Sequence, residues 1–259
     1  STPIIYFNED LVRKAGGDPD NFPTTWDGIF ALSNKIAKLG NDDIGLFHSW
    51  AITGNWMWQA LVFSYGGQMM SNDEKTIAFD REPGKKAIEL LGRMVREGGM
   101  PDLTPEASRA AFFSGKLGIW TESTSLLRVA DNGVAGKFKW RTARFPVPGP
   151  DAKLPTGGAA AMMFATDPAK QAAAWKFMKF ITGPVGATIM VKGTGYMPPN
   201  SLPANDPAML KAYYAERPNY LTSLSQQPFM TAWYAFPGDN NLKIIKVIKD
   251  RLQTVVDKS

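Results

Sequence analysis

Apolar residues recur at helical spacing in several segments of this chain. Residues 25–39 carry one such stripe, residues 87–96 a second and residues 242–256 a third. A period of three to four residues predicts an amphipathic helix that turns one face to a core. Gly40 and the pair Gly98-Gly99 follow the first two stripes and predict where those helices end.

Five further helix boundaries are predicted from capping residues. Thr24 or Thr25, with Asp27 shortly after, opens the helix of the first stripe. The other four starts place a residue suited to capping directly before a proline, which fits the first position of a helix. They are Thr104-Pro105, Asp167-Pro168, Gly183-Pro184 and Asp206-Pro207.

Short apolar runs bounded by Gly or Pro predict strands between these helices. We expect strands at residues 3–7, 44–47, 118–121, 142–146 and 160–164. Strands that alternate with helices indicate an α/β fold. Residues 146–158 hold four prolines and three glycines, which predicts a crossing segment or hinge rather than a packed element.

Length and charge exclude some classes of protein. A chain of 259 residues with 44% hydrophobic residues can bury a sizeable core, and no run of eighteen apolar residues occurs that could span a bilayer. The opening STPIIYFNED lacks a secretion signal, so we expect that a signal was removed or that the chain starts inside a longer protein. The net charge of +5 comes from scattered residues, which argues against a nucleic-acid partner.

The residues that most enzymes need are scarce. There is one histidine, His48, and no cysteine. Without a Gly-x-Ser-x-Gly elbow or a glycine-rich phosphate loop, we expect no catalytic residue, no metal site and no cofactor. Paired carboxylates, for example Glu122 with an aspartate, leave a glycoside hydrolase open as an alternative. The more informative excess is aromatic, with eight Trp, seven Tyr and fifteen Phe.

Six short motifs occur in a characteristic order. They are the opening strand and helix ending in Pro23-Thr24-Thr25-Trp26, then Phe112–Lys116, Ile119–Ser125, Thr156–Ala159, Ala173–Thr188 and Thr194–Pro198. Together they resemble the family 1 extracellular solute-binding proteins of ABC importers, of the sugar or sn-glycerol-3-phosphate binder type. The resemblance covers essentially the whole chain.

This resemblance implies a periplasmic-binding-protein-like (type II) α/β fold. Residues 5–148 and 200–259 would form most of the second lobe, and residues 149–199 a hinge crossing with a strand-helix-helix segment of the first lobe. Family members are longer, so we expect the N-terminal part and the C-terminal end to be lacking. Trp175, Phe177, Phe180 and Met190 would then lack their usual partners, which favours a dimer or a domain swap.

Aromatic residues are the first candidates for the ligand site, because sugars present apolar faces and a rim of hydroxyls. By the resemblance, Trp56 sits where the family places a stacking tryptophan, and Trp233 with Tyr234 resembles an aromatic pair of the oligosaccharide binders. Trp50 is a second candidate. Trp58 lies about 200° from Trp56 on a helix, so we expect it in the core; burial of Trp56 itself is the alternative.

The polar candidates lie in loops. Trp120 lies at the end of the strand predicted at residues 118–121, and Glu122 and Ser123 follow it. Glu122 would accept sugar hydroxyls, and Ser123 either binds ligand or only caps the next helix. Gly157 and Gly158 allow close approach of a ligand, or serve a hinge. Tyr196 would donate a hydroxyl from the far wall. Lys243 lies near the place where phosphate-binding relatives put a basic residue, or is an ordinary surface lysine.

The sequence therefore predicts the substrate-binding component of an ABC transporter, which captures a carbohydrate or polyol in the periplasm for import. The alternative within binding proteins is an sn-glycerol-3-phosphate (phosphodiester) binder. The expected partners are a small ligand and an ABC permease in the inner membrane, and a lipid-anchored extracellular location remains open.

Overall fold

A four-stranded mixed sheet organises the chain in the computed structural model, which describes residues 1–149 and 151–259. Its strand order is β2-β3-β1-β4, with β1 at Pro3–Asn8, β2 at Ile44–His48, β3 at Leu117–Ser123 and β4 at Trp140–Arg144. Strand β1 is antiparallel to both of its neighbours, whereas β2 and β3 are parallel. A second, two-stranded parallel sheet joins β5 (Leu154–Thr156) to β6 (Met230–Ala232).

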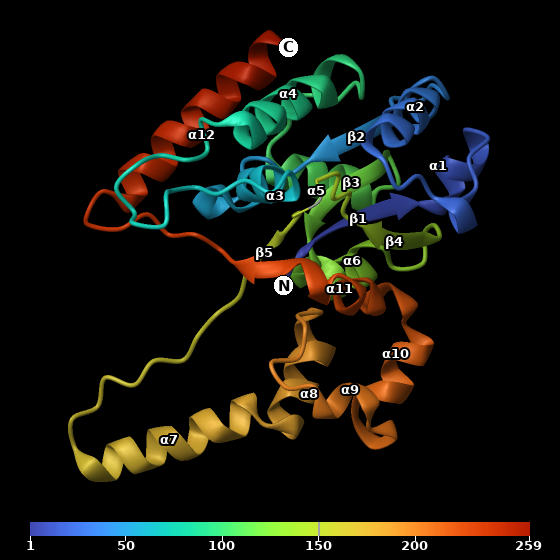
Figure 1. Cartoon of the computed structure of the whole chain (residues 1–259). Coiled ribbons are helices and arrows are strands. Elements are labelled where there is room, and N and C mark those ends of the chain that lie inside the picture. Colours follow the sequence, from blue (N-terminus) through green and yellow to red (C-terminus); the bar gives the residue numbers. More distant parts are fainter. Residues whose placement is uncertain (150) are drawn as a thin grey trace.

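Helices surround the main sheet and extend below it (Figure 1). Helix α2 packs on β2 and α5 packs on β3, while α4 and α12 lie side by side. The helices are α1 (Glu9–Lys14), α2 (Trp26–Ala37), α3 (Trp56–Ser64), α4 (Glu82–Arg96), α5 (Pro105–Phe113), α6 (Leu127–Val134), α7 (Pro168–Thr182), α8 (Pro184–Thr194), α9 (Leu202–Asn205), α10 (Ala212–Glu216), α11 (Leu221–Ser225) and α12 (Asn241–Lys258). Two short turns matter for the site, η2 (Thr53–Asn55) and η3 (Thr124–Leu126).

All five predicted helix starts are confirmed. The Thr25 hydroxyl accepts the Gly28 N–H, and Thr104 and Asp167 cap α5 and α7 in the same way. These bonds satisfy N–H groups that a helix start otherwise leaves unpaired. Gly183 opens α8 without a side-chain bond. After Asp206 the chain forms a π-helical turn, Pro207–Lys211, before α10 begins.

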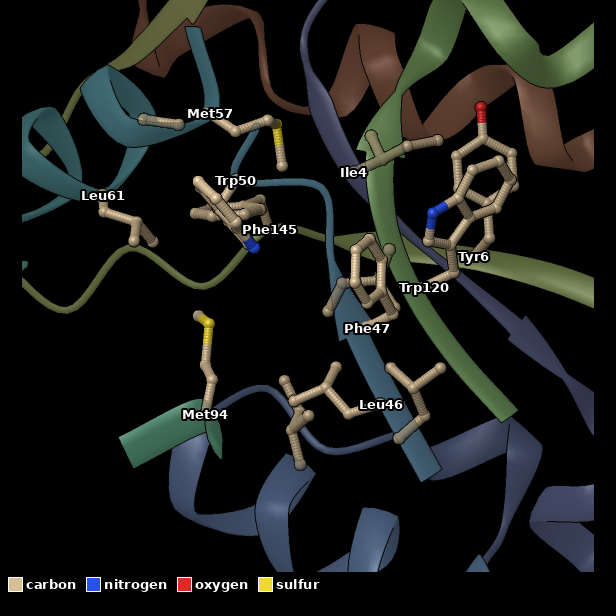
Figure 2. Close-up of a cluster of buried hydrophobic side chains, with 14 of the residues drawn as sticks. Ile4, Tyr6, Leu46, Phe47, Trp50, Met57, Leu61, Met94, Trp120 and Phe145 are labelled. Atoms are coloured by element: carbon tan, nitrogen blue, oxygen red, sulfur yellow. The ribbon is translucent and has the colours of Figure 1, made fainter. Parts of the chain in front are cut away.

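The core forms where α2, α3, α4 and α5 meet the sheet. Every residue of β1 and β3 is buried, and Tyr6, Phe112 and Trp120 pack with ring centroids 5.2 to 6.1 Å apart. Figure 2 shows part of this cluster, including Tyr6 and Trp120 from the sheet and Met57 and Leu61 from α3. Helix α3 is buried on every side, which explains why its sequence lacks a polar face.

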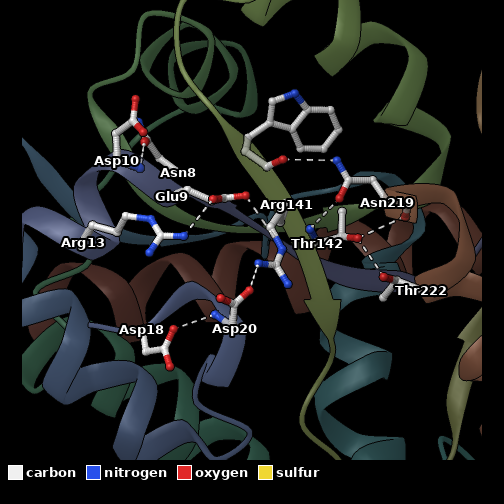
Figure 3. Close-up of polar contacts among 11 residues, drawn as sticks. Asn8, Glu9, Asp10, Arg13, Asp18, Asp20, Arg141, Thr142, Asn219 and Thr222 are labelled. Atoms are coloured by element: carbon white, nitrogen blue, oxygen red, sulfur yellow. Dashed lines mark hydrogen bonds and ion pairs between the residues drawn. The ribbon is translucent and has the colours of Figure 1, made fainter. Parts of the chain in front are cut away.

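Polar contacts complete the outer edge of β4, where no further strand pairs with it in the described part of the chain. The Asn219 side chain bonds both Trp140 O and Thr142 N, at 3.2 and 3.1 Å. These contacts take the place of a strand neighbour for an otherwise unpaired edge. Arg141 in turn reaches Asp20 at 2.6 Å (Figure 3), so the edge is also linked to the loop after α1.

The strand predicted at residues 160–164 is wrong. This stretch has no regular secondary structure, and Met162 and Phe164 are 73% and 86% exposed. An apolar run becomes a strand only beside a strand that takes its hydrogen bonds, and none of the described residues supplies one here. The other four strands are confirmed. The expectation that residues 146–158 contain no packed element is also wrong, because Leu154–Thr156 form β5, which pairs with β6 and buries Leu154. Pro150 of this segment lies outside the described residues.

Helix α7 exposes apolar side chains. Figure 1 shows it standing away from the main sheet at the end of a long extended segment, and none of its residues is buried. Trp175, Phe177 and Phe180 are each more than half exposed, as the resemblance implied. Met190 differs from that expectation, because it packs partly buried against the core.

No helix among the described residues combines the length and the apolar character needed to cross a bilayer. This agrees with the absence of a long apolar run in the sequence.

His48 predicts how stability responds to acid. Its ring is fully buried at the end of β2, with Nδ1 2.6 Å from Thr121 Oγ1, and burial lowers the pKa of His48 to about 3. An unfolded chain has a histidine pKa near 6.5, so it takes up a proton below that pH while the folded state does not. His48 therefore contributes stability above pH ~6.5, and this contribution is lost as the pH falls toward about 3.

We expect the free energy of unfolding of the His48→Asn variant to fall less steeply than that of the parent as the pH is lowered from 6 to 4. The slope lost is at most about 1.4 kcal/mol per pH unit between pH 6 and 4. Urea unfolding of the parent and the variant at pH 7.5, 6, 5 and 4 measures this effect. The difference in unfolding free energy between the two proteins isolates His48, because the other titrating groups are common to both. Parallel curves for the two proteins would contradict this account.

Candidate ligand-binding site

A hollow of about 800 Å³ opens beside the main sheet. Four parts of the chain that are distant in sequence form its wall: the segment from Ala51 to Trp56, the face of α5 with the end of β3 and η3, the loop after β5, and Trp233 after β6. Tyr196 and Lys249 complete it. Because sheet and helices fix each wall, the hollow is formed by the tertiary fold and not by one local motif.

Trp56 and Gly157 lie against each other on one side of the hollow. A Cβ built on Gly157 would lie 3.3 Å from Trp56 Cε2 and 2.9 Å from Ser1 Oγ, so glycine permits this close approach. Gly157 also exchanges backbone hydrogen bonds with Ser1. Gly158 lines the hollow next to it. A Cβ built on Gly158 would have Tyr196 Cε1 as its nearest atom among the described residues, at 3.9 Å, so this position leaves more space than Gly157 does.

Trp233 is held by two fixed contacts. Its indole Nε1–H donates to Gly54 O at 3.0 Å. One residue further, the buried Gln59 amide bonds both the N–H and the C=O of Tyr234, each at 2.9 Å. Gly54 has φ +77°, and a Cβ there would lie 2.9 Å from Trp233 Cζ2. The orientation of the Trp233 ring therefore depends on α3 and η2 rather than on its own strand.

The end of β3 supplies a buried carboxyl group. Glu122 is 3% exposed, and its Oε1 accepts the Ser123 N–H at 2.7 Å. Burial raises the pKa of Glu122 to about 7, against the opposite influence of that N–H, the Ser49 hydroxyl and the Arg109 guanidinium. Ser123 caps η3 through the Ser125 N–H and lines the hollow at the same time, so the capping role does not remove it from the wall.

Tyr196 reaches the hollow from the end of α8. Gly195 ends that helix with φ +90°, and a Cβ there would lie 2.6 Å from Leu127 Cβ. The close approach holds the end of α8 against the start of α6, which brings Tyr196 beside Gly158. The Tyr196 N–H is bonded to the Thr194 hydroxyl at 3.0 Å.

The structure brings together most of the predicted site residues. Those that line the hollow are Trp56, Glu122, Ser123, Gly157, Gly158, Tyr196 and Trp233. Trp50 and Trp120 do not, because they are 2% and 0% exposed in the core. Trp120 lies in the middle of β3, where α5 covers it, and its Nε1–H donates to Ser49 at 3.1 Å.

The basic residue predicted on α12 lies on another face of that helix. Lys243 is exposed and is not part of the wall, which holds Lys249 instead. The Ile245 carbonyl accepts a bond from Asn55 of η2, and Lys249 follows one turn later on the same face. Residues 245 and 249 are four apart and so lie on one face of α12. The sequence does not show that this face meets η2, so it could not single out Lys249.

The face of α5 toward the hollow was also missed. Pro105, Glu106 and Arg109 all line it, at the spacing that places residues on one side of a helix. The sequence pattern of these residues is that of an ordinary helix start, with a threonine cap and a proline, and gives no sign of a ligand site. The wall thus combines aromatic faces with two carboxyl groups, a guanidinium and an ammonium group, which suits a polar small molecule with some apolar surface.

Fold and site together define a binding protein of the α/β class. The chain belongs to the bacterial extracellular solute-binding protein family, which matches residues 1–217. This confirms the resemblance, and because members are transport receptors and not enzymes, it excludes the glycoside hydrolase alternative.

The chain is similar to binding proteins of known name. It is 25% identical over 239 residues to the sn-glycerol-3-phosphate-binding periplasmic protein UgpB of Shigella flexneri serotype 5b (strain 8401), covering 87% of this chain and 53% of that protein. The chain therefore spans about half the length of the curated relatives it matches.

Solved structures share the fold. UgpB from Mycobacterium tuberculosis in complex with glycerophosphocholine superposes with a TM-score of 0.77 at 22% identity, over 100% of this chain and 69% of that chain. The sugar-binding protein MalE from Xanthomonas citri gives a TM-score of 0.79 at 18% identity, over 98% and 63%. The predicted α/β class of periplasmic-binding-protein type is confirmed at this level.

We expect Gly54→Ala to displace the Trp233 ring. Gly16→Ala is the matched control, since Gly16 has a similar φ of +76° but no atom within 4 Å of a built Cβ. Both variants should lose about 1 kcal/mol of stability from the left-handed backbone, and only Gly54→Ala should also change the tryptophan fluorescence spectrum. Equal spectra for the two folded variants would argue against the contact.

Glu122 predicts a pH effect opposite to that of His48. Because its pKa is about 7 in the folded chain and near 4.3 when unfolded, the folded state binds the extra proton between these values. Stability from this group is full below pH ~4.3 and is lost as the pH rises through about 7. The variant Glu122→Gln should therefore gain melting temperature over the parent between pH 5 and 8; a constant difference across that range would exclude the shifted pKa.

Proposed function

We propose that this chain is the ligand-binding part of an ABC importer receptor that captures a carbohydrate or polyol in the periplasm. The observation that supports this most is the hollow in which Trp56, Trp233 and Tyr196 lie beside Glu122 and Ser123. Flat rings bind the apolar faces of a sugar, and fixed polar groups bind its hydroxyls. Membership of an extracellular solute-binding family is consistent with capture outside the inner membrane.

We also propose how the chain is divided. Residues 5–148 and 200–259 would form one lobe, and residues 149–199 the crossing and a segment of the other lobe. The pairing of β5 with β6 supports this, because it sets the segment that leaves the first part of this lobe beside the segment that returns to it. Ligand contacts from both sides would favour a closed form, which an inner-membrane permease would recognise.

A second candidate ligand is sn-glycerol 3-phosphate or a related phosphodiester. Arg109 and Lys249 in the wall favour it, since guanidinium and ammonium groups bind phosphate oxygens. Its binding should weaken as salt rises from 50 to 500 mM, whereas binding of a neutral sugar should change little.

Trp233→Ala tests the proposed function. We expect it to weaken binding of a neutral sugar at least tenfold, because an aromatic wall of the hollow is lost. Trp175→Ala is the matched control, a tryptophan on α7 that is 54% exposed and outside the wall. Thermal-shift screening of D-tagatose, maltose and laminaribiose, followed by calorimetric titration, measures both.

Two results would contradict the proposal. In the first, none of the three sugars raises the melting temperature of the folded chain at millimolar concentration. In the second, Trp175→Ala weakens binding as much as Trp233→Ala does.

A further inference from the structure

Arg109 is a half-buried arginine that forms no ion pair within the described chain. Three arginines with comparable side-chain exposure, Arg93, Arg141 and Arg217, each contact a carboxylate at 3.0 Å or less. Among residues 1–149 and 151–259, the enclosed Nε–H of Arg109 also lacks an acceptor. A guanidinium in such a position usually has a partner, and Arg109 lines the hollow.

Glu122 is the ionisable group that Arg109 influences. The Arg109 guanidinium lowers the pKa of the Glu122 carboxyl, against the larger effect of burial, and the two side chains form no ion pair among the described residues. They come from different elements, α5 and β3, which hold them on the same stretch of wall with Ser123 and Ser125. The wall of one hollow therefore holds a fork of N–H donors and a carboxyl acceptor that are not joined to each other by an ion pair among the described residues.

We propose that Arg109 and Glu122 together bind neighbouring hydroxyl groups of a neutral carbohydrate, and that Arg109 is a specificity-determining residue. Each hydroxyl both donates and accepts a hydrogen bond, so adjacent hydroxyls can donate to the carboxyl and accept from the guanidinium. A phosphate dianion can only accept, and above pH about 7, where Glu122 is ionised, a phosphate bound to Arg109 in this hollow would also meet the negative charge of Glu122. This inference rests on the proposed function and specifies the ligand charge.

The other charges of the wall support a neutral ligand. Glu106 is on α5 next to Arg109, and Lys249 approaches from α12, so two acidic and two basic side chains face the hollow. The amino group of Ser1 also lies there, and burial lowers its pKa to about 6. The charged side chains that line the hollow are thus of both signs, Glu106 and Glu122 with Arg109 and Lys249, whereas selection of an anion favours an excess of basic groups.

Calorimetric titration of Arg109→Gln, Arg109→Lys and Glu122→Gln tests the proposal. The probes are the tightest-binding sugar among D-tagatose, maltose and laminaribiose, and sn-glycerol 3-phosphate. Arg109→Gln and Glu122→Gln should each raise the dissociation constant for the sugar at least tenfold, because a charge-assisted hydrogen bond is lost. Arg109→Lys should weaken it less, since lysine keeps the charge but not the fork. Arg13→Gln on the exposed face of α1 is the matched control and should bind like the parent.

Three results would overturn the proposal. One is unchanged sugar affinity in a folded Arg109→Gln variant, which leaves the proposed function standing. Another is sn-glycerol 3-phosphate binding more tightly than every sugar and gaining affinity in Glu122→Gln, which makes this an anion site and favours the second candidate ligand. The third is a folded parent chain that binds none of the probes, which contradicts the proposed function itself.

Discussion

The position of β1 between β3 and β4 is the constraint on which the rest of the structure depends. All six residues of this strand are buried, and it pairs along its length with a strand on each side. Burial without unpaired backbone groups is possible only because both edges of β1 are bonded. The Tyr6 hydroxyl donates to Ser123 O at 2.6 Å, so the same strand also fixes the end of β3, where the hollow begins.

A second consequence is that the site is assembled from distant segments. Gln226 bonds the start of β1 and the end of β4, which ties the return of the chain near residue 226 to the main sheet. From there β6 runs beside β5 and delivers Trp233 to η2. Aromatic and charged groups from the start, the middle and the end of the chain thus meet in one hollow. Trp233 and Glu122 are held there by hydrogen bonds, and Trp56 by the close approach of Gly157.

Burial shifts the pKa values of two ionisable side chains in opposite directions, and in both cases it favours the neutral form. His48 in the core is kept neutral by burial, and the carboxyl group of Glu122 is kept partly protonated by the same desolvation. His48 is part of the core: one ring nitrogen contacts the Thr121 hydroxyl, and His48 is not among the residues that line the hollow. Glu122 lies in the wall, where a group with a perturbed pKa beside an unpaired guanidinium is typical of a functional site.

Sequence alone determined the elements and the class of this protein. Helical periodicity, capping residues before proline and short apolar runs predicted four of the main-sheet strands and most helix starts, because these signals act within a few residues. The order of the six sequence motifs indicated the family. Of the ten predicted site residues, seven line the hollow. Tertiary structure decided the rest. It buried Trp50 and Trp120, placed Lys249 and not Lys243 in the wall, left residues 160–164 without regular secondary structure and brought Arg109 and Glu122 into one hollow. Each of these depends on contacts between segments far apart in the chain, and no local pattern encodes which face of a helix, or which edge of a sheet, meets a partner.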